Sequence, residues 1–168
     1  MALPKLVLTD IDGVWTDGGM YYDQGENELK KFNTGDSAGV LFLKLSNIPV
    51  GIVTGENTQI VKRRAVKLKI DHLFLGVKNK VEVIEHLLQK LNLEWKDVAY
   101  IGDDINDIIV LQKAGFSATP SNAPDYVQKH ADLTLPVKGG DGAFRAFVEY
   151  LLKRENSLDL VIEKYLAS

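Results

Sequence analysis

Cysteine is absent from the 168-residue sequence. Its absence excludes disulfide bonds, thiolate metal ligands and catalysis by a thiol. Long apolar runs are absent as well: the stretch Lys5–Thr9 near the start is too short for the core of a signal peptide, and no run reaches membrane-spanning length. We therefore expect a cytoplasmic protein that does not associate with a membrane.

An excess of positive charge is also missing. The chain has 20 Lys and Arg against 23 Asp and Glu, a formal net charge of −3, so we expect no general attraction to nucleic acid or to an anionic membrane. An anionic ligand would have to be attracted locally, by a metal ion or a lysine. The length fits one domain covering residues 1–168, and the 45% hydrophobic and 26% charged residues are ordinary for a globular protein.

Short apolar stretches alternate with amphipathic ones along most of the chain. Continuous apolar strands indicate a sheet covered on both faces, and the βαβα order predicts an α/β domain with a doubly wound, mainly parallel sheet. Such sheets bind ligands beyond the carboxyl ends of their strands. The predicted strands are Lys5–Thr9, Val50–Val53, Leu73–Leu75, Val98–Ile101, Phe116–Ala118 and Leu133–Leu135. The predicted helices are Ser37–Leu45, Thr58–Leu68, Lys80–Leu91, Asp107–Lys113, Ala123–Lys129, Gly142–Lys153 and Leu158–Leu166.

The segment Val14–Phe32 breaks this alternation. Two β-prone runs flank the turn cluster Asp23-Gln24-Gly25, which is typical of a projecting β-hairpin. The run Met20-Tyr21-Tyr22 would form an exposed apolar patch on a free-standing hairpin. Packing against a neighbouring subunit and packing back onto the chain's own core are both open at this point.

Acidic side chains follow two of the predicted strands. Asp10 and Asp12 come after the first strand, and if strand geometry continues to them they point the same way, at the carboxyl edge of the sheet. Two close carboxylates repel one another unless a cation or a proton intervenes. Asp103, Asp104 and Asp107 follow a later strand and offer the oxygen ligands that a hard cation prefers. A turn cluster and an acidic helix start are the structural alternatives.

Two further polar groups follow the strands between them. Thr54 comes after the second parallel strand, where a hydroxyl and a free backbone N–H at a strand-to-helix turn can hold a phosphate. Lys80 begins a helix, where a cation opposes the helix dipole, so another role is indicated. A helix N-cap and a surface lysine are the alternatives. The placement of these groups after four different strands predicts one shared site.

The motif DIDGVWT, followed by Thr54, Lys80 and GDDIND, resembles the four-motif signature of the haloacid dehalogenase superfamily of phosphohydrolases. The resemblance covers the chain from Lys5 to about Arg145 and implies a magnesium-dependent phosphatase. It implies that Asp10 is the nucleophile and forms an aspartyl-phosphate intermediate. Thr54 and Lys80 would hold the transferring phosphoryl group.

The same resemblance implies roles for the other acids. Asp12 would be the general acid and base. Asp10 and Asp103 would bind Mg²⁺ through their carboxylates, and Asp12 would bind it through its backbone carbonyl. Asp104 and Asp107 would support these metal ligands from behind.

A cap domain is missing from the pattern. Many relatives carry one after the first motif or between Thr54 and Lys80, but these gaps hold only the hairpin with one helix, and one helix with one short strand. The capless layout and the stretches KKFNTGDSAGV and GGDGAFR resemble the sugar-acid phosphatases, which act on 3-deoxy-D-manno-octulosonate 8-phosphate or on nonulosonate 9-phosphates. Members of that group are typically homotetramers whose hairpins wall neighbouring sites, so we expect a homotetramer.

The residue after Thr54 and Gly55 distinguishes the two branches of that group. The octulosonate enzymes usually have TGR, whereas Glu56 stands here and resembles the nonulosonate branch, which acts on deaminoneuraminic or sialic acid phosphates. Arg64 and Lys67 share a helix face and can meet a sugar carboxylate. We therefore predict that Gly55, Glu56, Arg64 and Lys67 bind a nonulosonate 9-phosphate. An octulosonate 8-phosphate is the alternative substrate, and a solvated basic helix is the alternative for Arg64 and Lys67.

Two functions without catalysis remain as alternatives. A response-regulator receiver domain also gathers acids, a threonine and a lysine around a phosphorylated aspartate on a parallel sheet. Its phosphorylated aspartate normally follows an interior strand and comes after the acidic pair, whereas Asp10 follows the first strand here. A catalytically idle assembly domain is the second alternative, and the presence of every residue implied by the resemblance disfavours it.

Overall fold

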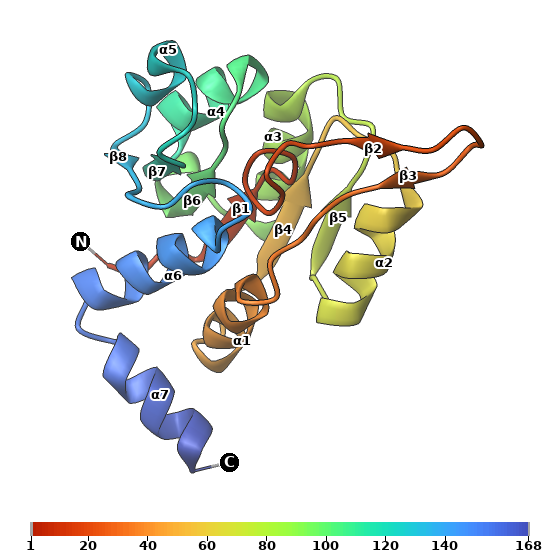
Figure 1. The fold of residues 1–168 in the computed structure, drawn as a ribbon. Helices are drawn as coiled ribbons and strands as arrows, with labels where there is room; N and C mark the ends of the chain where they lie inside the picture. The colour runs from red at the N-terminus through yellow and green to blue at the C-terminus, as the bar shows by residue number, and fades with distance from the viewer. Residues whose placement is uncertain (1, 168) are drawn as a thin grey trace.

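Six parallel strands form one sheet in the computed structural model, which describes residues 2–167. The strands are β1 (Leu6–Thr9), β4 (Val50–Val53), β5 (His72–Phe74), β6 (Val98–Ile101), β7 (Phe116–Thr119) and β8 (Leu133–Thr134). They lie in the order β5-β4-β1-β6-β7-β8 (Figure 1). The chain begins at the centre of the sheet and winds outward in one direction and then in the other, which confirms the predicted doubly wound α/β fold.

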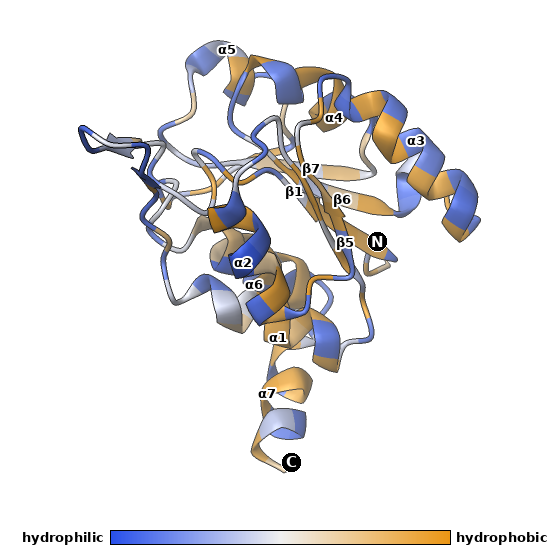
Figure 2. Cartoon of the chain, turned by 90° about the vertical axis from the view of Figure 1, so that its right-hand side faces the viewer, coloured by the Kyte–Doolittle hydropathy of each residue, from blue (hydrophilic) through white to orange (hydrophobic). Residues whose placement is uncertain are grey.

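Helices cover both faces of the sheet, as its continuous apolar strands require. One face carries α1 (Asp36–Leu45), α2 (Gln59–Leu68) and α6 (Ala143–Arg154), with α7 (Leu158–Leu166) packed on α1 and α6. The other face carries α3 (Lys80–Leu91), α4 (Ile108–Lys113) and α5 (Asp125–Gln128). Figure 2 shows the apolar strands between α3 and α4 on one side and α1, α2 and α6 on the other.

The period-two alternation of strand side chains divides the core into two clusters. Leu6 and Leu8 of β1 pack against α3 and α4, whereas Val7 packs against the helices of the opposite face. Directly after β1, the buried ring of Trp15 stacks on Phe144 of α6, with ring centroids 4.5 Å apart. This contact ties the turn that follows β1 to the C-terminal part of the chain.

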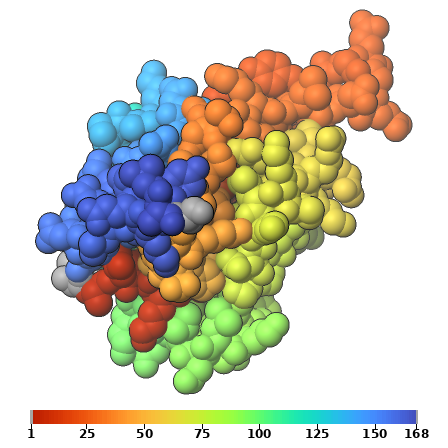
Figure 3. Space-filling view, turned by 90° about the horizontal axis from the view of Figure 1, so that it is seen from below, coloured from red at the N-terminus to blue at the C-terminus, as the bar shows by residue number. Residues whose placement is uncertain are grey.

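The hairpin projects from this body. Its strands β2 (Tyr21–Tyr22) and β3 (Glu28–Leu29) pair antiparallel, and a bridge between Thr16 and Phe32 closes its base. Tyr22 is 68% exposed and Leu29 is 65% exposed, so the apolar side chains do not fold back onto the chain's own core. Figure 3 shows the hairpin as an arm extending beyond the body. A projecting hairpin without a cap domain is confirmed for the residues that the structure describes.

The predicted element bounds agree with the structure to within two residues, which is the usual disagreement at element ends. The largest difference is at α5, which begins at Asp125 rather than Ala123. Pro124 keeps an extended backbone with ψ of 144°, so the helix cannot start before it. Within residues 2–167, every helix is too short or too polar to cross a bilayer.

Candidate active site

A pocket of about 280 Å³ opens at the carboxyl end of the sheet, where the central strands β1, β4 and β6 lie side by side. Its walls come from the turns after these strands and from the start of the hairpin. The lining residues are Asp10, Asp12, Gly13, Gly18, Met20, Thr54, Gly55, Glu56, Asp103, Asp104 and Asn106. The structure thus brings together the acids and Thr54 that the sequence placed after separate strands, at the edge where doubly wound sheets bind their ligands.

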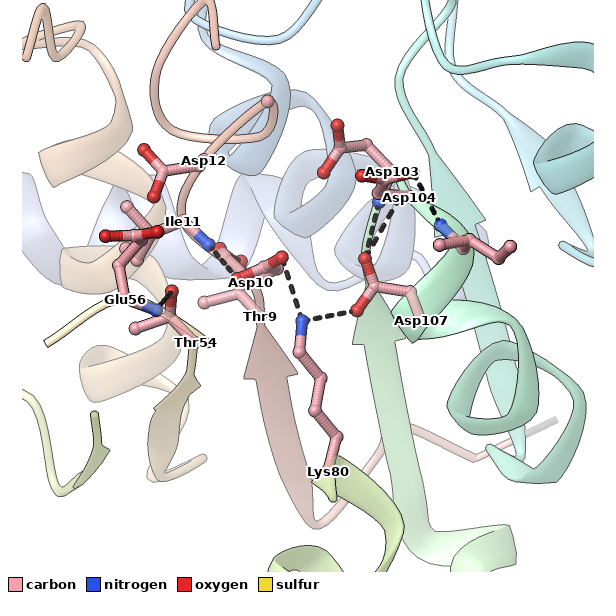
Figure 4. A network of polar contacts seen from close by, with 12 residues as sticks. Thr9, Asp10, Ile11, Asp12, Thr54, Glu56, Lys80, Asp103, Asp104 and Asp107 are labelled. Atoms are coloured by element: carbon pink, nitrogen blue, oxygen red, sulfur yellow. Dashed lines mark hydrogen bonds and ion pairs between the residues drawn. The ribbon is translucent and has the colours of Figure 1, made fainter. Parts of the chain in front are cut away.

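The turn after β1 carries the first two acids. The strand ends at Thr9, and the chain then coils so that the Trp15 N–H donates to the carbonyl of Ile11 at 2.8 Å. Asp10 and Asp12 both line the pocket, as predicted. The expected reason, a strand geometry that continues through both residues, is wrong, because both lie in the turn after β1. Figure 4 shows their carboxylates directed apart, and each has different partners.

Close backbone approach shapes this turn. Gly13 has φ of +79°, and a Cβ on it would lie 1.8 Å from Oδ2 of Asp103. Behind the turn, a Cβ on Gly139 would lie 1.8 Å from the carbonyl oxygen of Gly13, and the Gly140 N–H donates to the carbonyl of Val14 at 3.0 Å. The glycine-rich segment before α6 therefore packs on the catalytic turn of its own chain, where only residues without side chains fit.

Lys80 lies beneath the pocket floor at the start of α3. Its Nζ is 2.8 Å from Oδ2 of Asp10 and 2.6 Å from Oδ1 of Asp107 (Figure 4), and the side chain is almost fully buried. Burial lowers the pKa of Lys80, but the two carboxylates outweigh this effect and the net pKa is raised. Lys80 is therefore a fixed positive charge beside the candidate nucleophile.

Asp107 connects this lysine to the loop after β6. Its Oδ1 also accepts a hydrogen bond from the buried hydroxyl of Tyr100, and its Oδ2 accepts from the backbone N–H groups of Asp103 and Asp104 at 3.0 and 3.1 Å. Both oxygens of this fully buried carboxylate are thus engaged. The position of Lys80 and the shape of the acidic loop are set by one side chain.

Burial and mutual repulsion shift the titration of the acids. Burial raises the pKa of Asp10 to about 6, because the opposing effect of Lys80 is only partial and Asp107 adds repulsion. Burial raises the pKa of Asp103 to about 8, with further repulsion from Asp10 and Asp107. Without a metal ion, Asp10 and Asp103 therefore bind protons more tightly than ordinary aspartates, and a bound cation would replace these protons.

Thr54 and Glu56 form the wall opposite the acidic loop. The Thr54 side chain is buried, and its Oγ1 accepts the Glu56 N–H at 3.3 Å, at the turn between β4 and α2. The Glu56 carboxylate lines the pocket, and no other residue between 2 and 167 engages it in a hydrogen bond or ion pair. It is free to accept hydrogen bonds from a ligand.

Arg64 and Lys67 are not brought to this pocket within one chain. They line a separate cavity of about 360 Å³ beneath the hairpin. The Arg64 Nη2 donates to the carbonyl of Asn33 at 3.1 Å, and its guanidinium lies 5.7 Å from the centroid of the Phe32 ring. The prediction that both contact a substrate bound by their own chain therefore receives no support from the geometry.

Comparisons with known proteins agree with this arrangement. A family model described as a haloacid dehalogenase-like hydrolase matches residues 76–147. A 3-deoxy-D-manno-octulosonate 8-phosphate phosphatase from Salmonella typhi is 37% identical over 155 residues, which cover 92% of this chain and 82% of the relative. The chain belongs to the haloacid dehalogenase-like hydrolases. It falls in their capless sugar-acid phosphatase group, so it is a phosphoric monoester hydrolase.

Two solved structures of this hydrolase group have the same fold. A probable YrbI family phosphatase from Pseudomonas syringae has a TM-score of 0.94 and 39% identity, covering 98% of this chain and 93% of that one. The 3-deoxy-D-manno-octulosonate 8-phosphate phosphatase from Moraxella catarrhalis, in complex with magnesium, phosphate and KDO, has a TM-score of 0.92 and 34% identity, covering 96% and 93%. Dependence of these hydrolases on a divalent metal is thereby supported, and the Mg²⁺ prediction is confirmed.

The strand order separates this hydrolase from a receiver domain. Receiver domains have the flavodoxin-like order 2-1-3-4-5, whereas here the first strand of the chain is followed outward by the second and third on one side and the fourth to sixth on the other. Asp10 therefore lies at the centre of the sheet by a different topology. The receiver alternative is wrong.

The donor set of this hydrolase fits Mg²⁺. Carboxylate oxygens of Asp10, Asp103 and Asp107 lie within 4.8 Å of one another, and hard oxygen ligands suit this ion. Both oxygens of Asp107 are already engaged, whereas Oδ1 of Asp103 is buried without a hydrogen-bond partner among the described residues. Asp10 and Asp103 would thus hold the ion and Asp107 would fix the loop, whereas the backbone carbonyl of Asp12 as a third ligand stays a prediction from the family resemblance.

The raised pKa values predict how pH acts on stability. Between about pH 4 and pH 8, the folded metal-free hydrolase binds protons at Asp10 and Asp103 more tightly than the unfolded chain does. The free energy of unfolding should therefore fall as the pH rises through this window. Mg²⁺ replaces these protons, so its stabilising effect should grow over the same range. Thermal unfolding with chelator and with Mg²⁺ across this range measures both trends.

The matched control for this experiment is Asp103→Asn, which should flatten the pH dependence of the metal-free protein above about pH 6. Below that pH the dependence should persist, because burial raises the pKa of both Asp10 and Asp36 to about 6. A melting temperature without metal that stays constant from about pH 4 to pH 8 would contradict the electrostatic description of the site.

Two residues at this site were missed by the sequence analysis. Tyr100 precedes the acidic loop in the middle of a buried strand, and the need of a buried hydroxyl for a partner is a signal that could have identified it. Lys30, from the hairpin, lies with its Nζ 2.7 Å from Oδ2 of Asp12. Its neighbour Lys31 is exposed, and nothing in the sequence tells the two apart.

Proposed function

We propose that this hydrolase removes the phosphate from a phosphorylated 2-keto-3-deoxy sugar acid through an aspartyl-phosphate on Asp10. The observation that carries the proposal is the position of Lys80, a buried cation 2.8 Å from the Asp10 carboxylate beneath a pocket that Thr54 also lines. A carboxylate can attack phosphorus only if the negative charges of both partners are neutralised. Sequence relatives and solved structures of the same group support the substrate class.

The chemistry follows from the placement of each group. An oxygen of Asp10 forms a bond to phosphorus while the bond from phosphorus to the sugar oxygen breaks, and Asp12 gives its proton to that oxygen. Water then attacks the phosphorus of the aspartyl-phosphate, and Asp12 accepts the water proton. The bond between phosphorus and the Asp10 oxygen breaks, so that inorganic phosphate leaves and the Asp10 carboxylate is restored. Thr54 and Lys80 hold the phosphoryl oxygens in both steps. Bound Mg²⁺ supplies additional neutralisation of the phosphoryl charge.

The nine-carbon acids are the substrates we favour within this class. Glu56 lines the pocket with a carboxylate free to accept hydrogen bonds from sugar hydroxyls, and a glutamate at this position resembles the nonulosonate branch, whereas the octulosonate enzymes usually have arginine there. The second candidate is 3-deoxy-D-manno-octulosonate 8-phosphate, favoured by the relatives that carry this name at 37% identity. The two candidates share the same chemistry at phosphorus and differ in the part of the sugar that meets Glu56.

A direct comparison of catalytic efficiency decides between them. We expect kcat/KM to be higher for a nonulosonate 9-phosphate than for the octulosonate 8-phosphate, and Glu56→Arg to shift the ratio toward the latter. Loss of one charge-assisted contact costs about 2 kcal/mol, or about thirtyfold in efficiency. Glu56→Gln is the matched control, because it keeps the size of the side chain. A preference of the unchanged protein for the eight-carbon acid would reverse the substrate assignment and leave the phosphatase intact.

A homotetramer is the assembly we propose for this hydrolase. The hairpin exposes Met20, Tyr21, Tyr22 and Leu29, and a run of apolar side chains on a projecting arm is typical of a protein interface. Without a cap domain, the pocket is walled by the turns after the strands and by the start of the hairpin. A neighbouring subunit would add a further wall, and Arg64 and Lys67 would then reach a substrate bound by that neighbour. A cytoplasmic location likewise stays a prediction.

Light scattering tests the assembly. We expect the unchanged protein to have the mass of a tetramer, and Leu29→Asp to dissociate it and to raise KM for the sugar acid at least tenfold, because binding surface is lost. Tyr126→Asp, at an exposed aromatic residue of α5 away from the hairpin, is the control and should change neither quantity. Full activity of a monomeric species would refute the shared wall.

A further inference from the structure

Lys30 is a buried cation that the proposed reaction does not yet use. It directly follows β3, on the strand that returns from the hairpin, and its side chain is 0% exposed. Its Nζ lies 2.7 Å from Oδ2 of Asp12 and 3.6 Å from Oε1 of Glu28. Taking an ammonium group out of water is costly unless a partner compensates. Asp12 supplies the shorter of the two contacts.

The Asp12 carboxylate is held from two sides. Oδ2 accepts from Lys30, while Oδ1 accepts from the Thr16 hydroxyl at 3.3 Å. The Thr16 oxygen is itself fixed by the backbone N–H groups of Gly13 and Gly18, at 3.3 and 3.2 Å. Thr16 belongs to the same tight turn as Asp12, whereas Lys30 reaches Asp12 from the returning strand of the hairpin, between β3 and the base at Phe32. Lys30 is therefore the contact that makes the orientation of Asp12 depend on the hairpin.

We propose that Lys30 is a positioning residue for Asp12, so that the hairpin holds the general acid and base in its working orientation. The proposal rests on the proposed function, because it assumes that Asp12 moves protons in both half-reactions. The Asp12 side chain is 26% exposed, and without Lys30 only the 3.3 Å contact with the Thr16 hydroxyl opposes its rotation toward water. Misplacing a catalytic group by about 1 Å can lower the rate on the order of a hundredfold.

The two half-reactions depend on Asp12 to different degrees, which gives the proposal a specific signature. A good leaving group such as p-nitrophenolate departs without a proton, so phosphorylation of Asp10 from p-nitrophenyl phosphate does not need the acid. Hydrolysis of the aspartyl-phosphate needs the base whatever the leaving group was. Loss of Lys30 should therefore slow the second step selectively and let the phosphorylated protein accumulate.

The experiment is stopped-flow and steady-state kinetics of Lys30→Met with p-nitrophenyl phosphate, in the full-length protein with Mg²⁺. We expect a burst of p-nitrophenolate near one equivalent per active site, followed by steady-state turnover lowered on the order of a hundredfold. Lys31→Met is the matched control, because Lys31 is the next residue and its side chain is 61% exposed. Its Nζ lies 3.9 Å from Oδ2 of Asp17 and not beside Asp12. It should behave as the unchanged protein. Lys30→Arg should recover much of the rate, because a cation again reaches Asp12.

A double-mutant cycle with Asp12→Asn completes the test. If Lys30 acts through Asp12, adding Lys30→Met to Asp12→Asn should produce little further loss of turnover. Equal kinetics of Lys30→Met and Lys31→Met, additive losses in the cycle, or a burst reduced in proportion to the steady-state rate would each overturn the proposal. The proposed function fails separately, if Asp12→Asn turns over as fast as the unchanged protein. Light scattering shows whether Lys30→Met keeps the assembly of the unchanged protein. If turnover falls only because the assembly dissociates, direct positioning of Asp12 by Lys30 is also overturned.

Discussion

Replacing Asp10 by asparagine should abolish turnover, with a loss on the order of a million-fold, the scale seen when the nucleophile of a covalent hydrolase is removed. A neutral amide is a poor nucleophile, and it is also a weaker ligand for Mg²⁺. Steady-state release of inorganic phosphate measures the loss. Acid quenching with labelled substrate should also show no phosphate attached to the Asp10→Asn protein.

The fold should survive this substitution. Asp10 in the metal-free protein is a buried carboxylate whose pKa is raised to about 6, so the site gains little stability from its charge. Lys80 keeps its second partner, Asp107, at 2.6 Å. Asp159→Asn, at an exposed aspartate in the first turn of α7 and outside the pocket, is the matched control and should retain full activity. Near-normal turnover by Asp10→Asn would remove the covalent mechanism from consideration.

Removing the metal should have the second-largest effect. We expect chelator to lower turnover on the order of a thousandfold or more, because the ion supplies several kcal/mol of charge stabilisation at phosphorus. Added Mg²⁺ should restore the rate, whereas Ca²⁺ should bind yet support little turnover, since its larger and more flexible shell misplaces the reacting groups. Phosphate release after exhaustive dialysis against chelator measures the dependence.

The control for metal removal is Asp103→Asn. Its rate should already be low with Mg²⁺ present and should respond weakly to chelator. The reason is that the substitution replaces the Asp103 carboxylate, whose pKa is raised to about 8, by a neutral amide that binds the ion weakly. Full activity of the chelated, unchanged protein would contradict the assignment of Asp10 and Asp103 as metal ligands.

The strand and helix positions could be predicted because burial imposes the same rule on every element. Leu6 and Leu8 face one layer of helices and Val7 the other, so the strand reads as a continuous apolar run in the sequence. The grouping of Asp10, Thr54 and Asp103 followed from the parallel topology, since the carboxyl ends of neighbouring strands meet at one edge. These inferences needed only short-range patterns and one fold-level rule.

The contacts made by long side chains could not be predicted in this way. Lys30 and Lys31 are adjacent and identical in type, yet one is wholly buried against Asp12 and the other is exposed. The difference depends on how the hairpin lies over the pocket, which no periodicity encodes. Arg64 and Lys67 share a helix face as expected, but that face meets the base of the hairpin instead of the active-site pocket. Helical spacing says which residues are neighbours and not what they meet.

The packing of Gly139 against Gly13 has a consequence for how the protein is made. The two residues lie near opposite ends of the chain, and the contact leaves no room for a side chain. During synthesis the N-terminal residues emerge first, at about 5–20 residues per second. A nascent chain that has not yet reached residue 139 therefore already carries Asp10 and Asp12 but lacks the segment that packs behind their turn. The turn that carries Asp10 and Asp12 can therefore reach its full packing only after the glycine-rich segment has been synthesised.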